Sequence, residues 1–298
     1  MNLAEYEKLL SVSRKNYSFL KIDPKASSKA KSYNTRGKKV CFLRHDIDYD
    51  PENALRIART EAEMGIISTY TVLLTGEFYN PFEPNNRRLL NEISDLGHHL
   101  GLHFDPTVHD IQDEEDLDRS IIKEKMALED LLSTKVDMFS FHNTTDFSMS
   151  CRKKIYGKCQ NAYSKFFHKE VEYTSDSNGY WRFRDWETFL SEEHPIIQIL
   201  THPIWWQPNN HLPPLETITK FMLKKYRNQM DSYNKLFINQ IDRENVSYLS
   251  SHLKKQNKLN NKDLLNNYVT DKDLVNYLMN EKEDKEVLGR IIEEYVNR

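Results

Sequence analysis

The chain has 298 residues and a formal net charge of -3, so it is long enough to bury a substantial core. Its 42 basic and 45 acidic residues are interspersed, without the basic footprint that dominates nucleic-acid binding. These numbers exclude nucleic acid as an expected partner and favour one catalytic domain with an extension.

The expected cellular compartment follows from the lack of a targeting signal and from the spacing of the cysteines. The N-terminal sequence has no apolar core of signal-peptide length, and no stretch reaches the roughly 18 apolar residues of a spanning helix. We therefore expect a cytoplasmic protein without a transmembrane segment. The three cysteines, Cys41, Cys151 and Cys159, lack CxxC spacing, which argues against a disulfide framework and a thiolate zinc site.

Strand and helix patterns alternate along the first two thirds of the chain. Apolar runs predict strands at residues 39–45, 67–74, 99–104, 136–142, 171–177 and 195–202. Helical spacing predicts helices between them at residues 51–65, 87–97, 113–132 and 185–193. Such alternation implies parallel strands joined by crossover helices, and this number of units favours a closed or nearly closed barrel over an open sheet.

The composition changes after Pro214. Residues 215–298 are rich in Lys, Asn, Leu and Tyr and have helical periodicity. We therefore predict three parts: a helical lead-in at 1–37, a βα barrel at 38–213 and a helical extension at 214–298. The extension offers a contact surface for a homo-oligomer.

Side chains that can bind a metal or transfer a proton follow the ends of the predicted strands. This is where a βα barrel carries its catalytic groups. The first strand is followed by Asp46 and Asp48, the third ends at His103, the next at His142, and the last at His202. Aspartates at i and i+2 of a strand point the same way, so one can bind a metal while the other accepts a proton from metal-bound water. A divalent metal lowers the pKa of water from about 15.7 towards about 7. The alternative is that both aspartates cap the following helix, but Asp50 already occupies the N-cap position before a proline.

The remaining histidines are placed less favourably. His98 and His99 precede or open the third strand, so they are expected at the bottom of the barrel. His109 lies in a loop and stays an open candidate. Four others are interpreted as structural because no strand end presents them: His168, His194, His211 and His252.

Six segments in this order resemble the polysaccharide deacetylase superfamily, the carbohydrate esterases of family four: RHDIDYDPENALRIARTEAEMGIISTYTVLL, FYNPF, LGHHLGLHFD, SFHN, YTSDSNGYWR and LTHPIWW. The resemblance covers roughly residues 38–207 and is greatest to a branch encoded among bacterial surface-polysaccharide genes. It implies a distorted (β/α)7 barrel, here with the C-terminal helical extension.

The resemblance also implies roles for the strand-end residues. Asp46 matches the catalytic base, Asp48 a metal ligand and His202 the general acid. The histidine motif matches at His103, whereas its second histidine position holds Thr107.

We predict that His142 completes the metal site, because a catalytic zinc takes three protein ligands plus water and neighbouring strands lie about 4.8 Å apart. Asp105 and His109 are the alternatives. In the superfamily the third motif presents an arginine that orients the base; this chain has Phe141, His142 and Asn143 there.

Three residues are predicted to contact substrate: Asn143, Asp176 and Trp205. Asp176 sits where the family keeps an acidic group near the catalytic histidine or the substrate; a turn with Gly179 is the alternative. Trp205 and Trp206 are expected to stack on a pyranose, with packing between the barrel and the extension as the alternative.

The expected reaction is zinc-dependent hydrolysis of an N-acyl amide on an amino sugar. The absence of an export signal points to a cytoplasmic glycan precursor as substrate. Two alternatives remain: a metal-dependent amidohydrolase of small nitrogen compounds on the same barrel, and a catalytically degenerate barrel that acts as a binding or scaffold protein in glycan assembly.

Overall fold

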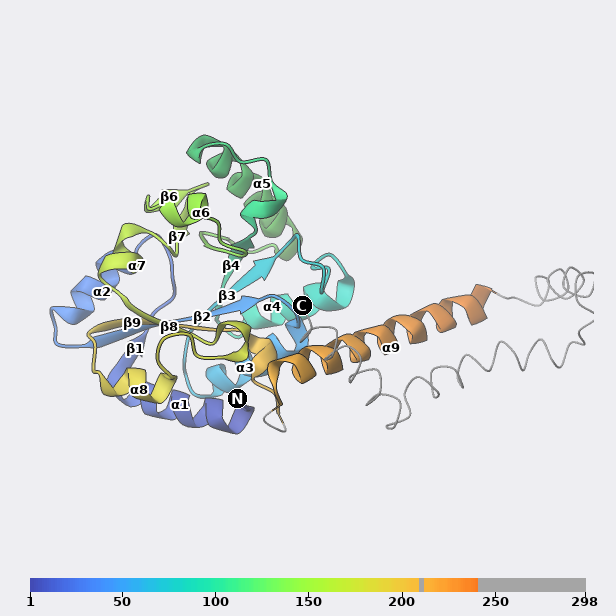
Figure 1. Cartoon of the computed structure of the whole chain (residues 1–298), viewed down its shortest axis with the longest axis horizontal. Helices are drawn as coiled ribbons and strands as arrows, with labels where there is room; N and C mark the ends of the chain where they lie inside the picture. Colours follow the sequence, from blue (N-terminus) through green and yellow to red (C-terminus); the bar gives the residue numbers. More distant parts are fainter. Residues whose placement is uncertain (209–211, 241–298) are drawn as a thin grey trace, which may run out of the picture. The chain divides into compact units, whose positions relative to one another are not determined.

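A computed structural model describes residues 1–208 and 212–240 (Figure 1). Residues Met1–Thr217 form one compact unit, and the chain from Ile218 onwards forms a second. The predicted helical extension beyond Gln240 lies outside the described residues, as do His211 and His252. None of the described helices is both long and apolar enough to cross a membrane.

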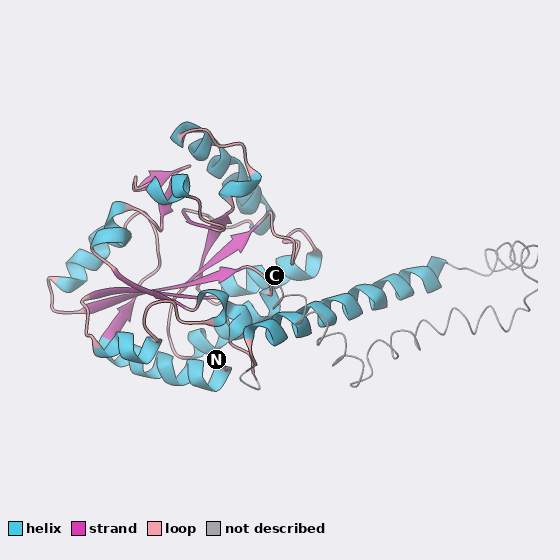
Figure 2. Ribbon diagram, in the orientation of Figure 1, coloured by secondary structure: helices cyan, strands magenta, loops and turns pink. Residues whose placement is uncertain are grey.

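The first unit is built on one curled sheet of nine strands (Figure 2). Its strands are β1 (Tyr17–Phe19), β2 (Lys39–Ile47), β3 (Thr69–Leu73), β4 (His99–Phe104), β5 (Met138–Phe141), β6 (Ile155–Tyr156), β7 (Cys159–Asn161), β8 (Glu172–Ser175) and β9 (Ile196–Thr201). Seven of them run parallel in the order β7-β5-β4-β3-β2-β9-β8, and β6 is antiparallel to β7. In the described part of the chain no pairing joins β8 to the other end of this order. The expected distorted barrel is thus confirmed, with one open seam.

β2 lies between β3 and β9 in this order. It pairs with β9 along Val40–His45 on one edge. Its other edge is shared, because β1 pairs with its first residues and β3 pairs with Arg44–Ile47. The first 37 residues, expected to be helical, therefore also supply a strand to the sheet.

Helices flank the strands (Figure 1). They are α1 (Leu3–Asn16), α2 (Ala26–Asn34), α3 (Pro51–Glu63), α4 (Pro84–Asp95), α5 (Glu114–Leu132), α6 (Asp146–Ser150), α7 (Lys165–Lys169) and α8 (Trp186–Ser191). A further helix, α9 (Pro214–Gln240), belongs mostly to the second unit. Asp50 caps α3 by accepting hydrogen bonds from the backbone N–H groups of Glu52 and Asn53, with Pro51 in the first turn. Because Asp50 has this role, Asp46 and Asp48 are left for the site.

An aromatic cluster attaches α1 to the barrel. Trp186 and Trp206 are fully buried, and both pack against Tyr6 of α1, with ring centroids 5.6 and 5.1 Å apart. The indole Nε1 of Trp186 donates to Ser13 Oγ at 3.0 Å, so its polar atom is satisfied inside the core. The lead-in is consequently an integral layer of the first unit.

A buried carboxylate, Glu61 of α3, ties four elements together. Its oxygens accept hydrogen bonds from Tyr6, His45, Ser68 and Tyr70. Nε2 of His45 lies 2.8 Å from Oε1, while its Nδ1 lies 2.7 Å from the Thr201 hydroxyl on β9. Burial alone would raise the pKa of Glu61, but His45 and the other donors lower it to about 2.

This pKa predicts a pH dependence of stability. A carboxyl whose pKa is lowered by folding stabilises the native state above its unfolded pKa of about 4.5, and that contribution disappears as the pH falls towards 2. The shift corresponds to about 3 kcal/mol. We expect Glu61→Gln to lower the free energy of unfolding at pH 7 and to weaken its decrease between pH 5 and pH 3, measured by urea denaturation. Parallel pH profiles for the variant and the wild type would contradict the assignment.

Candidate metal centre

The carboxyl ends of β2, β4, β5 and β9 bring the predicted site residues together. Asp46 lies within β2 and Asp48 just after it; His103 lies near the end of β4; His142 follows β5 and His202 follows β9. Among the described residues, one group of His, Cys, Asp or Glu side chains has metal-binding geometry: Asp48, His103 and His142, whose ligand atoms all lie within 4.8 Å of one another.

The three ligand atoms form a nearly regular triangle. His103 Nε2 lies 3.1 Å from Asp48 Oδ1, His142 Nδ1 lies 3.3 Å from the same oxygen, and the two imidazole nitrogens are 3.1 Å apart. Zinc bonds of 2.0 to 2.2 Å in a tetrahedron place neighbouring ligand atoms roughly 3.3 to 3.6 Å apart. The donor set and its spacing therefore fit a zinc ion with an open fourth position.

Charge and hydrogen bonding keep Asp48 ionised and fix the orientation of the His103 ring. Burial would raise the pKa of Asp48, but hydrogen bonds with His103 and His142 hold it well below its usual range. His103 Nδ1 lies 2.8 Å from Ser140 Oγ, so a hydrogen bond on the far ring nitrogen directs Nε2 towards Asp48. The carboxylate is thus ionised and the imidazole oriented, as metal ligation requires.

The predicted base, Asp46, is held by an arginine that we did not assign from the sequence. Arg44 Nη2 donates to Asp46 Oδ2 at 3.2 Å, and Arg44 Nε lies 3.0 Å from Asp46 Oδ1 in the same ion pair. Thr71 also donates to Oδ1 at 2.7 Å. Burial would raise the pKa of Asp46, but the guanidinium lowers it. The signal of Arg44 in the sequence was a charge two residues before Asp46 in an apolar strand.

The predicted general acid, His202, is hydrogen-bonded to a buried carboxylate, that of Asp176. Its Nδ1 lies 2.7 Å from Asp176 Oδ1, and its Nε2 lies 3.8 Å from Asp48 Oδ2. Burial would lower the pKa of His202, but Asp176 raises it to about 9, which favours a protonated ring.

Asp176 was predicted to contact substrate, yet it is fully buried. Its carboxylate accepts hydrogen bonds from the backbone N–H and ring of His202 and from Trp206 Nε1. We therefore assign Asp176 to positioning His202, which corrects the substrate-contact interpretation.

The alternative third ligands are engaged elsewhere. Asp105 Oδ1 accepts hydrogen bonds from the backbone and hydroxyl of Thr107, and Oδ2 accepts one from Asn143 at 2.8 Å. His109 is hydrogen-bonded to the buried Glu124 and stacks on Phe104 with ring centroids 4.9 Å apart. Asn143 itself is exposed next to His142, where a substrate contact is sterically accessible.

The two tryptophans after β9 differ in exposure. Trp206 is fully buried, which leaves no ring face for a sugar, so the stacking expected of it is wrong. Trp205 lies in the 3-10 turn Pro203–Trp205 and is 8% exposed, with its centroid 6.3 Å from that of Tyr49. Little of its own surface is available for stacking.

The other described histidines lie outside the site. His98 and His99 are at the start of β4, as expected. His98 Nε2 is 2.8 Å from the carbonyl of Ala58, and His99 Nε2 is 2.9 Å from Asp137 Oδ1. His168 is exposed on α7 and His194 pairs with Glu192.

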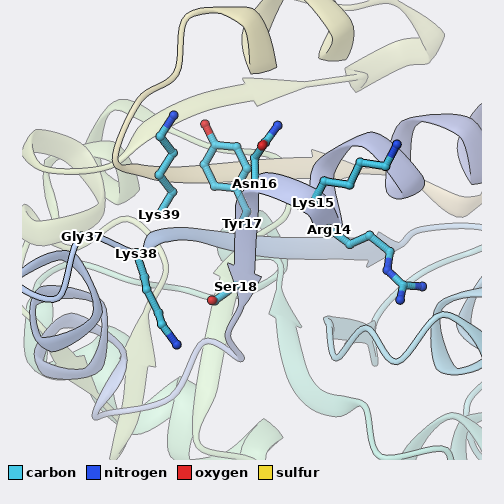
Figure 3. A pocket seen from close by; sticks show the side chains of 8 residues that line it. All are labelled: Arg14, Lys15, Asn16, Tyr17, Ser18, Gly37, Lys38 and Lys39. Atoms are coloured by element: carbon cyan, nitrogen blue, oxygen red, sulfur yellow. The ribbon is translucent and has the colours of Figure 1, made fainter.

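A hollow at the opposite end of β2 does not belong to this centre. It is lined by basic side chains from the end of α1 and the start of β2: Arg14, Lys15, Lys38 and Lys39. Figure 3 shows these four side chains pointing in different directions, so they do not converge on one ligand.

Among the comparisons with known proteins, only the comparison with solved structures finds similar proteins. No family model matches the chain, and no curated protein matches it. Solved structures similar to it are family 4 carbohydrate esterases. One from Bacillus anthracis is 17% identical, over 67% of this chain and 77% of that one, with a TM-score of 0.37. An acetyl xylan esterase from Clostridium thermocellum, solved with a cobalt ion, is 15% identical over 63% and 85%, with a TM-score of 0.38. A pseudoenzyme of the same family, BA3943 from Bacillus anthracis, is 15% identical over 63% and 62%, also with a TM-score of 0.38.

Proposed function

We propose that this protein is a metal-dependent hydrolase that removes an N-acyl group from an amino sugar. The observation that carries the proposal is the triangle of Asp48, His103 and His142 with a separate carboxylate and a separate imidazole beside it. Asp46 Oδ2 lies 3.8 Å from His103 Nε2, and His202 Nε2 lies 3.8 Å from Asp48 Oδ2. A base and an acid thus flank one candidate metal position.

The side chains divide the work of amide hydrolysis. A bound zinc ion would activate water and stabilise negative charge on the carbonyl oxygen. Asp46 accepts the proton of the attacking water at Oδ2, while Arg44 keeps the carboxylate ionised and fixed. His202 delivers a proton from Nε2 to the departing nitrogen, and Asp176 holds Nδ1 so that Nε2 faces the site.

The sequence resemblance favours an N-acylated sugar of a surface-polysaccharide precursor. The proposed substrate contacts are Asn143 and, through its indole N–H rather than its covered ring faces, Trp205. We propose that the activity is cytoplasmic and that residues 214–298 mediate self-association.

The activity is tested with full-length protein and penta-N-acetylchitopentaose as a model substrate. We expect zinc-loaded protein to release acetate and free amine, a chelator to abolish the release, and added zinc to restore it. Release of acyl groups only from small non-sugar amides would identify the amidohydrolase alternative. Zinc binding without hydrolysis of any amide would identify a degenerate barrel.

A further inference from the structure

An aromatic pair lies beside the candidate metal centre and has no part in the chemistry described above. Tyr49 directly follows Asp48, and its ring packs on Phe78 with centroids 4.4 Å apart and planes at 37°. Both rings are only half-buried. They come from different loops, since Tyr49 follows β2 and Phe78 follows β3.

The β3 loop is anchored so that Phe78 stays in place. Tyr79, the next residue, is 6% exposed, and its hydroxyl donates to the carbonyl of Ile47 while accepting from the N–H of Leu73, both at 2.9 Å. Asn80 adds a turn in which its side chain accepts from Phe82 N at 3.0 Å. A ring held by such a loop loses little conformational freedom when a ligand binds.

Around Tyr49 and Phe78, apolar ring faces lie close to a polar group that lacks a hydrogen-bond partner. The ring of Trp205 lies next to that of Tyr49, with centroids 6.3 Å apart, and its Nε1 atom is buried without a hydrogen-bond acceptor among the described residues. Such a donor is costly until an oxygen reaches it. Asp48, the residue before Tyr49, belongs to the candidate metal centre. A pyranose ring has this same combination, with an apolar C–H face and a rim of hydroxyl groups.

We propose that Tyr49 and Phe78 form a sugar-binding wall that stacks on the pyranose whose acyl group faces the metal centre. This rests on the proposed function, because it names the residues that select a sugar at that site. The wall replaces the predicted stacking by the tryptophans, whose ring faces are largely covered. Aromatic rings attract the slightly positive C–H edges of such a partner through their negative faces.

The test compares Phe78→Leu, which keeps apolar volume but removes the flat ring, with Phe78→Tyr, which keeps the ring. We expect Phe78→Leu to raise KM for penta-N-acetylchitopentaose about tenfold with a much smaller effect on kcat, and Phe78→Tyr to stay close to wild type. On 4-nitrophenyl acetate, which has no pyranose, the KM of Phe78→Leu should change much less than on the sugar. The matched control is Phe82→Leu, on the same loop and 55% exposed, which should leave the sugar KM unchanged.

Two outcomes would overturn the wall. One is an unchanged sugar KM in Phe78→Leu; the other is an equal loss on both substrates, which indicates general damage to the loop. Calorimetric titration of zinc-loaded protein with penta-N-acetylchitopentaose separates this proposal from the proposed function. Binding that Phe78→Leu weakens, in a protein without hydrolytic activity, would support the wall and refute the function. Absence of wild-type binding would refute the wall.

Discussion

Replacement of His142 by alanine is expected to weaken zinc binding more than about 100-fold and to abolish amide hydrolysis. The reason is that His142 Nδ1 supplies one corner of the ligand triangle, and two protein ligands do not form a stable catalytic zinc site. Zinc content after dialysis against a weak chelator, together with a competition titration for affinity, measures the effect.

The control is His109→Gln, because His109 is the competing histidine and glutamine retains a polar contact for Glu124. We expect this variant to keep its zinc. Loss of zinc in His109→Gln together with its retention in His142→Ala would reverse the ligand assignment. Thermal unfolding of both variants shows whether either loses zinc merely through loss of the fold.

Asp46→Asn is expected to keep zinc bound while kcat falls by about 10²- to 10⁴-fold, the usual contribution of a general acid or base. Asparagine has nearly the same shape but cannot accept the proton, and Asp46 is not one of the three atoms of the ligand triangle. Single-turnover rates on penta-N-acetylchitopentaose and zinc content in the same sample measure both effects.

Asp48→Asn provides the contrast, since it should lose zinc and activity together. The two aspartates are two residues apart, so a general disturbance of the loop would affect both variants alike. A rate for Asp46→Asn within tenfold of wild type would show that another group accepts the proton. Loss of zinc from Asp46→Asn would make Asp46 a ligand.

The strand ends could be predicted because parallel strands gather their carboxyl ends at one side of a sheet. Patterns of apolar residues therefore placed Asp46, Asp48, His103, His142 and His202 together before any geometry was known. Short strands escaped prediction. β7 contains only Cys159–Asn161, and its pairing depends on β5 and β6 more than on its own propensity.

Some parts of the site could not be predicted from the sequence. They depend on the direction in which a side chain points and on contacts between loops that are distant in the sequence. Asp176 sits in a turn-like segment, and only the fold shows that its carboxylate points inward to His202 and Trp206. Arg44 was visible as a charge in an apolar strand, but nothing in the sequence indicated that its guanidinium pairs with Asp46. The contact between Tyr49 and Phe78 requires the Tyr79 anchor, which no local pattern encodes.

The alternation of side chains along β2 restricts how this protein can change. Arg44 and Asp46 face the site, whereas His45 between them faces Glu61 and Thr201. Deletion of a single residue before position 44 would move Ile47 into the catalytic position and bury Asp46 against Glu61, where two carboxylates would repel each other. Insertion of a single residue there would instead move His45 into the catalytic position and turn Arg44 towards Glu61. Substitutions within the strand can be tolerated one at a time, but a change in its length would destroy the metal centre and the interior of the fold in the same step.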